Sequence, residues 1–124
     1  MNGTGQMICL KPMMRQPLYF LREWSVFMIY RTKNELEKTP IEGCMGGNGT
    51  VWMEKLLTGQ EEMMGKGRAY VRHTLNPGVL IGIHTNEGEM ETMVLVRGKA
   101  VHTINGQKQY LEEGDIIAAQ PGDS

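Results

Sequence analysis

Three polar residues stand close together between Gly78 and Gly98, in a pattern that suits metal coordination. His84 and Asn86 are two positions apart, so on an extended strand their side chains project to the same side. Glu91 begins the next expected strand after a link of four residues, so its side chain can lie at the same end of the strand pair as His84 and Asn86. First-row metals bind three or four nitrogen and oxygen donors that converge from rigid neighbouring strands. The spacing therefore predicts a divalent-metal site of His84 and Glu91, with Asn86 as a weaker amide ligand.

Each candidate ligand also has a plain structural role. Glu91 can form an exposed salt bridge or cap its strand, and Asn86 can be a turn residue. His102 shares a strand face with Ala100 and Ile104, so it can point inward as a further donor. The alternatives are a hydrogen-bonded filling position or a place on the outer face. His73 is expected to be a semi-buried strand residue. The sequence shows no Ser-His-Asp or Cys-His arrangement and no phosphate-binding loop, so no catalytic residue is assigned.

The segments that carry these residues have the pattern of short β-strands. Turn residues separate them and no helix lies between them, which predicts antiparallel sheets in a sandwich or barrel. Asn105-Gly106 predicts a type I′ hairpin, because both central residues of that turn need positive φ. One short helix is expected over residues 34–39, capped by Thr32 or Asn34. The expected strands are residues 51–58, 68–75, 79–84, 91–97, 100–104, 108–111 and 116–119.

The bulk composition describes one ordinary domain. The chain has 124 residues, a formal net charge of −1 and 22% charged residues, with no basic stripe that would suit nucleic acid. No segment approaches the ~20 apolar residues of a membrane span. We therefore expect neither nucleic acid nor a membrane as the partner. Cys9 and Cys44 form no CxxC motif, which predicts reduced thiols in a cytoplasmic protein.

Residues 1–27 lack the periodicity of the rest of the chain. They are expected to be either a poorly ordered extension or a segment translated from a start codon placed before the natural one. Met28 opens "MIYRTKNELEKTP", which reads like a natural beginning, and Arg22-Glu23 can be encoded by the ribosome-binding sequence AGGGAG. The expected division is residues 1–27 as an extension, 28–50 as an N-terminal arm with the short helix, and 51–124 as the domain.

The spacing of the candidate site resembles the first motif of the cupin superfamily, which reads G-x5-H-x-H, then three or four residues, then E-x6-G. The final segment "EEGDIIAAQPGDS" is similar to the start of the second cupin motif, and residues 67–124 are similar to small single-domain bacterial cupins. The resemblance implies an all-β antiparallel jelly-roll barrel. It also implies a divalent metal, Fe, Mn, Zn or Ni, at the candidate site. The matching positions here are Gly78, His84, Asn86, Glu91 and Gly98.

Two features depart from the cupin pattern. Asn86 stands where the motif has its second histidine, and the chain ends at Ser124, where the last metal histidine of the family would come next. We therefore expect a barrel that is incomplete at its C-terminal end, with open sheet edges that favour a homodimer. If a histidine followed, two histidines and one carboxylate would suit Fe(II) or Mn(II).

Two functions follow from this interpretation. The first is a binding protein that holds a divalent metal, a small polar metabolite (a sugar or a carboxylate), or both in its barrel. The second is a metal-dependent enzyme of the dioxygenase, isomerase or decarboxylase type, with a site completed by residues beyond Ser124. Stoichiometric metal would favour the enzyme, and an empty site would favour binding alone.

Overall fold

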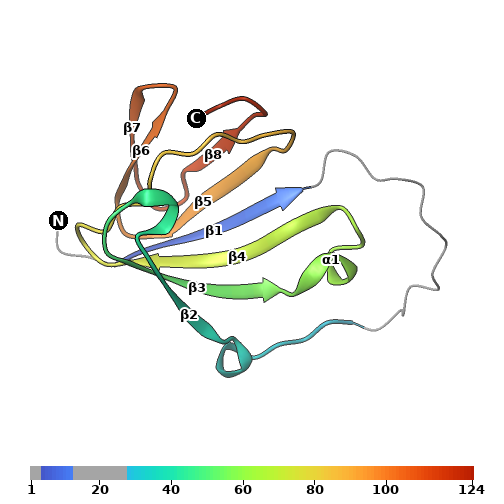
Figure 1. Cartoon of the computed structure of the whole chain (residues 1–124). Coiled ribbons are helices and arrows are strands. Elements are labelled where there is room, and N and C mark those ends of the chain that lie inside the picture. Colours follow the sequence, from blue (N-terminus) through green and yellow to red (C-terminus); the bar gives the residue numbers. More distant parts are fainter. Residues whose placement is uncertain (1–3, 13–27) are drawn as a thin grey trace.

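A six-stranded antiparallel sheet carries most of the fold, and the β6–β7 hairpin forms a second, two-stranded sheet (Figure 1). The structure, a computed structural model, describes residues 4–12 and 28–124. The large sheet has the strand order β2-β3-β4-β1-β5-β8. The strands are β1 (Gly5–Pro12), β2 (Lys38–Glu42), β3 (Thr50–Leu57), β4 (Gly67–Leu75), β5 (Glu91–Arg97), β6 (Ala100–Ile104), β7 (Gln107–Leu111) and β8 (Ile116–Ala119). The helical pieces are the 3-10 turns η1 (Lys33–Glu35) and η2 (Cys44–Gly46) and the one-turn helix α1 (Gly59–Glu62).

The expected fold class is confirmed: the chain is an antiparallel, cupin-like β fold with little helix. Six of the seven expected strands are present, each within two residues of its expected bounds. The β6–β7 turn is confirmed as well, since Asn105 and Gly106 have φ values of 50° and 79°. Within the described part of the chain, no helix is long and apolar enough to cross a membrane.

The N-terminal segment corrects one expectation. Residues 1–27 were expected to lie outside the fold, but Gly5–Pro12 forms β1, which pairs with β4 on one side and β5 on the other. Cys9 in this strand is 1% exposed and belongs to the core. The sequence did not predict this strand because it lacks the alternation of apolar and polar residues. The consecutive apolar residues lie on both faces of the strand: Met7, Ile8, Cys9 and Leu10. The proposed start at Met28 and the division at residues 28 and 51 stay predictions.

The short N-terminal helix is also smaller than expected. It covers only Lys33–Glu35, where the Glu35 carboxylate accepts hydrogen bonds from the backbone N–H and the hydroxyl of Thr32. The predicted helix over residues 34–39 is therefore wrong beyond its first turn. Lys38–Glu42 is the edge strand β2, and an edge is where a strand tolerates a proline such as Pro40.

The expected strand at residues 79–84 is absent. Leu80 makes one isolated bridge to Asn48, with backbone hydrogen bonds of 2.8 and 2.9 Å, and the Gly82 N–H donates to the Cys44 carbonyl at 2.9 Å. The glycine-rich loop of residues 43–49 thus satisfies the backbone groups that a neighbouring strand would otherwise satisfy. That prediction is wrong, although the segment stays tied to the rest of the fold.

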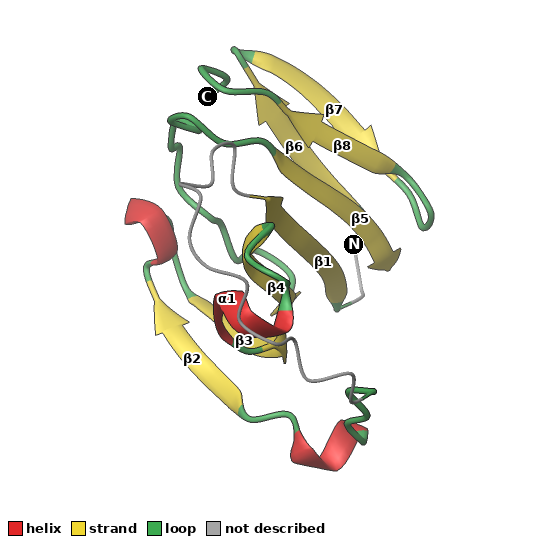
Figure 2. Cartoon of the chain, turned by 90° about the vertical axis from the view of Figure 1, so that its right-hand side faces the viewer, coloured by secondary structure: helices red, strands yellow, loops and turns green. Residues whose placement is uncertain are grey.

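The core lies between the inner face of the large sheet and the β6–β7 hairpin (Figure 2). Alternation along each strand turns one set of side chains toward this space. Ile104 and Leu111 of the hairpin pack against the buried cluster. The cluster consists of Cys9, Val71, Met93 and Ile117. Both Cys9 and Cys44 are free thiols.

Candidate functional site

Glu91 is the centre of the candidate site. It is the first residue of β5, and the alternating burial of that strand puts it on the inner face with Met93 and Leu95. The residue is only 7% exposed. A buried carboxylate is costly unless hydrogen bonds and an opposite charge compensate it, so its partners define the site.

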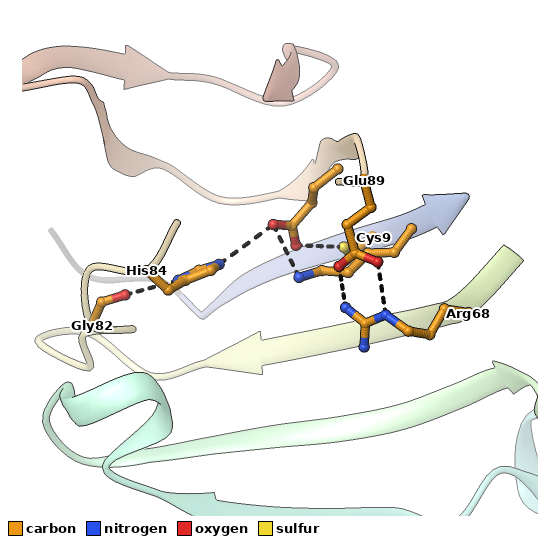
Figure 3. A network of polar contacts seen from close by, with 7 residues as sticks. Cys9, Arg68, Gly82, His84 and Glu89 are labelled. Atoms are coloured by element: carbon orange, nitrogen blue, oxygen red, sulfur yellow. Dashed lines mark hydrogen bonds and ion pairs between the residues drawn. The ribbon is translucent and has the colours of Figure 1, made fainter. Parts of the chain in front are cut away.

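Three side chains converge on the Glu91 carboxylate (Figure 3). The Cys9 thiol donates to Oε1 over 2.8 Å. Lys11 Nζ lies 3.3 Å from Oε2, and His84 Nε2 lies 3.5 Å from the same oxygen. Cys9 and Lys11 are two positions apart on β1, so both reach the inner face. The carboxylate is therefore held by two residues of β1 and one of the 79–84 segment.

The protonation states follow from these contacts. Burial acts to raise the pKa of Glu91, but the Cys9 hydrogen bond and the Lys11 charge outweigh it, and the pKa lies below its usual value. Burial, together with the hydrogen bond to Glu91, raises the pKa of the Cys9 thiol far above its ordinary value. Glu91 is therefore an ionised acceptor at neutral pH, and Cys9 is a neutral donor rather than a thiolate ligand.

His84 is oriented by its own segment. Its Nδ1 lies 3.1 Å from the Gly82 carbonyl oxygen, so the Nδ1–H donates there (Figure 3). Nε2, 3.5 Å from Glu91 Oε2, donates to a carboxylate when the ring carries its second proton. Gly82 itself is pressed against the loop, where an added Cβ would overlap the Met45 carbonyl. The His84 side chain is 33% exposed, which leaves this edge of the site open to a ligand.

Asn86 takes part through its backbone. Its N–H donates to the Asp123 carbonyl at 2.9 Å, and its own carbonyl accepts from Gly122 N–H at 2.7 Å. The residue is 5% exposed. These bonds tie the link between His84 and Glu91 to the turn at residues 120–123. The metal-ligand roles of His84, Glu91 and Asn86 stay predictions.

Two further histidines, His73 and His102, interact electrostatically with the Glu91 carboxylate. Burial lowers the pKa of His73 and of His102, while Glu91 acts in the opposite direction on both. His102 also interacts electrostatically with His84, and its buried Nδ1 has no hydrogen-bond partner among the described residues. The inward placement considered for His102 therefore agrees with the structure. Both imidazoles are neutral at neutral pH.

A divalent metal does not fit the site as these residues are arranged. Both carboxylate oxygens of Glu91 face protein donors, and the positive ammonium of Lys11 lies against Oε2. In the ranges 4–12 and 28–124, no three His, Cys, Asp or Glu side chains come together to hold an ion. Lys11 was missed by the sequence reasoning because it lies in the discounted segment. The sequence feature that could have revealed it is a lysine two positions after Cys9 in an apolar segment, which puts both side chains on the same face of a strand.

An ion pair beside the site neutralises the other nearby cation. Arg68 of β4 donates from Nε to Glu89 at 2.9 Å and from Nη2 to the second carboxylate oxygen of Glu89 (Figure 3). The hydrogen bond between them raises the pKa of Arg68 and lowers the pKa of Glu89, so both side chains stay charged. Lys11 is therefore the cation that compensates Glu91.

A second hollow lies on the opposite face of the large sheet. Its volume is about 600 Å³, and none of the sequence-predicted site residues lines it. Gln6 and Thr74 line it, and they alternate with Met7 and His73 of the inner face. Arg97 there offers a cation, which makes this hollow a useful control for anion binding.

Comparison with known proteins places the chain in a family. No family model matches it. The oxalate-binding protein of Thermotoga maritima is 34% identical over 97 residues, which make up 78% of this chain and 78% of that protein. The chain belongs to the family of this oxalate-binding protein. The crystal structure of a predicted oxalate decarboxylase from Thermotoga maritima superposes with a TM-score of 0.72 at 33% identity, covering 77% of this chain and 82% of that one.

Proposed function

We propose that this protein binds a small carboxylate, of which oxalate is the model, at the site formed by Lys11, His84 and Glu91. The observation that carries the proposal is the pairing of an ammonium and an imidazole on one side of a buried carboxylate. An ammonium has three N–H donors, so a second carboxylate can share Lys11 with Glu91. The family relationship to an oxalate-binding protein supports the same ligand class. The motif spacing also supports placing this family in the cupin superfamily.

Replacement of His84 by alanine is expected to weaken oxalate binding about tenfold, the loss of one hydrogen bond to a charged ligand. Isothermal titration calorimetry of oxalate into the purified protein measures this. Arg97→Met is the matched control, because Arg97 lies in the hollow on the opposite face and should leave the affinity unchanged. If oxalate binds neither with nor without added Mn²⁺, or if only Arg97→Met weakens it, the proposed site is wrong.

The alternative is a metal-dependent enzyme of the decarboxylase type. The likeness to a structure described as a predicted oxalate decarboxylase supports it. His84 beside Glu91 supplies two donors of the kind that first-row metals bind, once Lys11 no longer faces the carboxylate. Release of formate and carbon dioxide from oxalate, in the presence of Mn²⁺ and stopped by a chelator, would favour this function over binding alone.

We also propose that the protein is a cytoplasmic homodimer. Two free cysteines support a reducing compartment. The outer face of the large sheet exposes Leu10, Val96 and Ile116, which are 39%, 45% and 67% exposed, and a second copy could cover them. Light scattering coupled to size exclusion is expected to give twice the mass of 14.0 kDa, and Ile116→Lys to reduce it. A monomer at micromolar concentration would contradict the dimer.

A further inference from the structure

We propose that Lys11 is a built-in cation that takes the position of a divalent metal, so that the site binds a carboxylate without metal. The second half of this inference rests on the proposed function, but the exclusion of metal by Lys11 does not. It assigns a specific role to a residue of β1, the strand that enters the large sheet between β4 and β5.

The position of Lys11 is set by strand register. Leu10 pairs with Thr92 across β1 and β5, so in an antiparallel pair the next residues, Lys11 and Glu91, stand opposite each other. On the other side Lys11 pairs with Ala69 of β4, whose small side chain leaves room for the lysine stem. Opposite charges that face each other across strands stabilise a sheet. The ammonium is therefore placed at Glu91 by the pairing of the sheet.

Lys11 faces the same carboxylate oxygen as the imidazole. Nζ and His84 Nε2 lie 3.3 and 3.5 Å from Glu91 Oε2, and Oε1 accepts from Cys9. A cation bound between His84 and Glu91 would have to share Oε2 with an ammonium and would be repelled by its charge. The Lys11 side chain is 12% exposed, so solvent screens this repulsion poorly.

Without Lys11, the surroundings of Glu91 would resemble a metal site. The Arg68–Glu89 pair is already neutral as a unit. The Glu91 carboxylate would then be buried and uncompensated, with the His84 imidazole 3.5 Å from Oε2 and with His73 and His102 near enough to interact with its charge. Imidazole nitrogens and a carboxylate are the donors that first-row divalent metals prefer. One residue thus decides whether the site carries its own cation or recruits one.

Lys11→Met tests the inference, because methionine fills similar space without charge. Calorimetry and visible absorption with Co²⁺ as the probe are expected to show binding at least tenfold tighter in Lys11→Met than in the unmodified protein. Adding Glu91→Gln to this variant should remove the gain. Lys99→Met is the matched control, since Lys99 forms an exposed pair with Glu112 and its loss should not change Co²⁺ binding. Unmodified protein that binds one Co²⁺ as tightly as Lys11→Met would overturn the inference.

Oxalate titrations separate this inference from the proposed function. The chelator-treated protein is expected to bind oxalate equally well with and without Mn²⁺, whereas Lys11→Met should bind it only with Mn²⁺. A requirement for Mn²⁺ in the unmodified protein would overturn metal-independent binding. If no form binds oxalate, the proposed function fails, and the Co²⁺ titrations still decide the role of Lys11.

Circular dichroism melts check that each variant folds. If Lys11→Met does not fold, Co²⁺ binding by the unmodified protein decides: none at micromolar concentration supports the inference, and stoichiometric binding overturns it.

Discussion

Replacement of Gly82 by alanine is expected to lower the free energy of unfolding by about 3 kcal/mol, the upper part of the range for overpacked sites. An added Cβ would overlap the carbonyl of Met45 and lie 2.8 Å from the Gly47 nitrogen. Both are backbone atoms, so no side chain can rotate away. The loop and the 79–84 segment would have to separate, which would also break the hydrogen bond from Gly82 N–H to the Cys44 carbonyl.

The same substitution should disturb the site without touching its chemistry. The carbonyl of Gly82 orients the His84 ring, so a shift of this segment moves Nε2 away from Glu91. Oxalate affinity is expected to fall along with stability. Urea unfolding and calorimetry measure the two effects. Gly5→Ala is the control, because a Cβ there meets no atom closer than 4.0 Å. Equal stability of the two variants would show that the loop does not clamp the segment.

The sequence predicts strand β5 well, because β5 has a regular alternation of buried and more exposed side chains. The Asn105-Gly106 turn is equally local, since positive φ at two adjacent residues is a property of those residues. Features of this kind depend on a few neighbours along the chain. That is why the β5 strand and the β6–β7 hairpin were predicted correctly.

Lys11 shows what local patterns cannot supply. Its role depends on β1 lying beside β5, a contact between residues 80 positions apart (91 − 11) that no periodicity encodes. The predicted strand at residues 79–84 failed for a related reason. The side chains of this segment are of types common in strands, but no neighbouring strand pairs with it. The backbone of Asn48 in the glycine-rich loop pairs with Leu80 instead. In both cases the segment that lies alongside is set by tertiary packing, and it decides what the residues form.

Glu91→Gln is expected to destabilise the protein by about 3 kcal/mol, the lower bound for removal of one partner from a buried ion pair. The Lys11 ammonium, 12% exposed, would lose its compensating charge while staying on the inner face. The Cys9 thiol would keep only a neutral acceptor. Urea unfolding at neutral pH measures the loss. Glu112→Gln, which breaks the exposed pair with Lys99, is the control and should cost less than about 1 kcal/mol.

The effect should depend on pH in a defined direction. The pKa of Glu91 in the folded protein lies below its ordinary value of 4.5, so its contribution to stability is complete above that value. As the pH falls through the lowered pKa, the carboxylate takes up a proton and the contribution is lost. The difference in unfolding free energy between the unmodified protein and Glu91→Gln should therefore shrink below about pH 4.5.

A double variant separates the charge effect from simple loss of packing. In Lys11→Met/Glu91→Gln, no charge remains at this position of the inner face, so part of the stability lost in Glu91→Gln should return. Additive losses in the two single variants and the double variant would mean that Lys11 and Glu91 do not act as a pair. A stability difference that stays constant from pH 7 to pH 3 would lead to the same conclusion, because the Glu91 carboxylate would then make no charge-dependent contribution to folding.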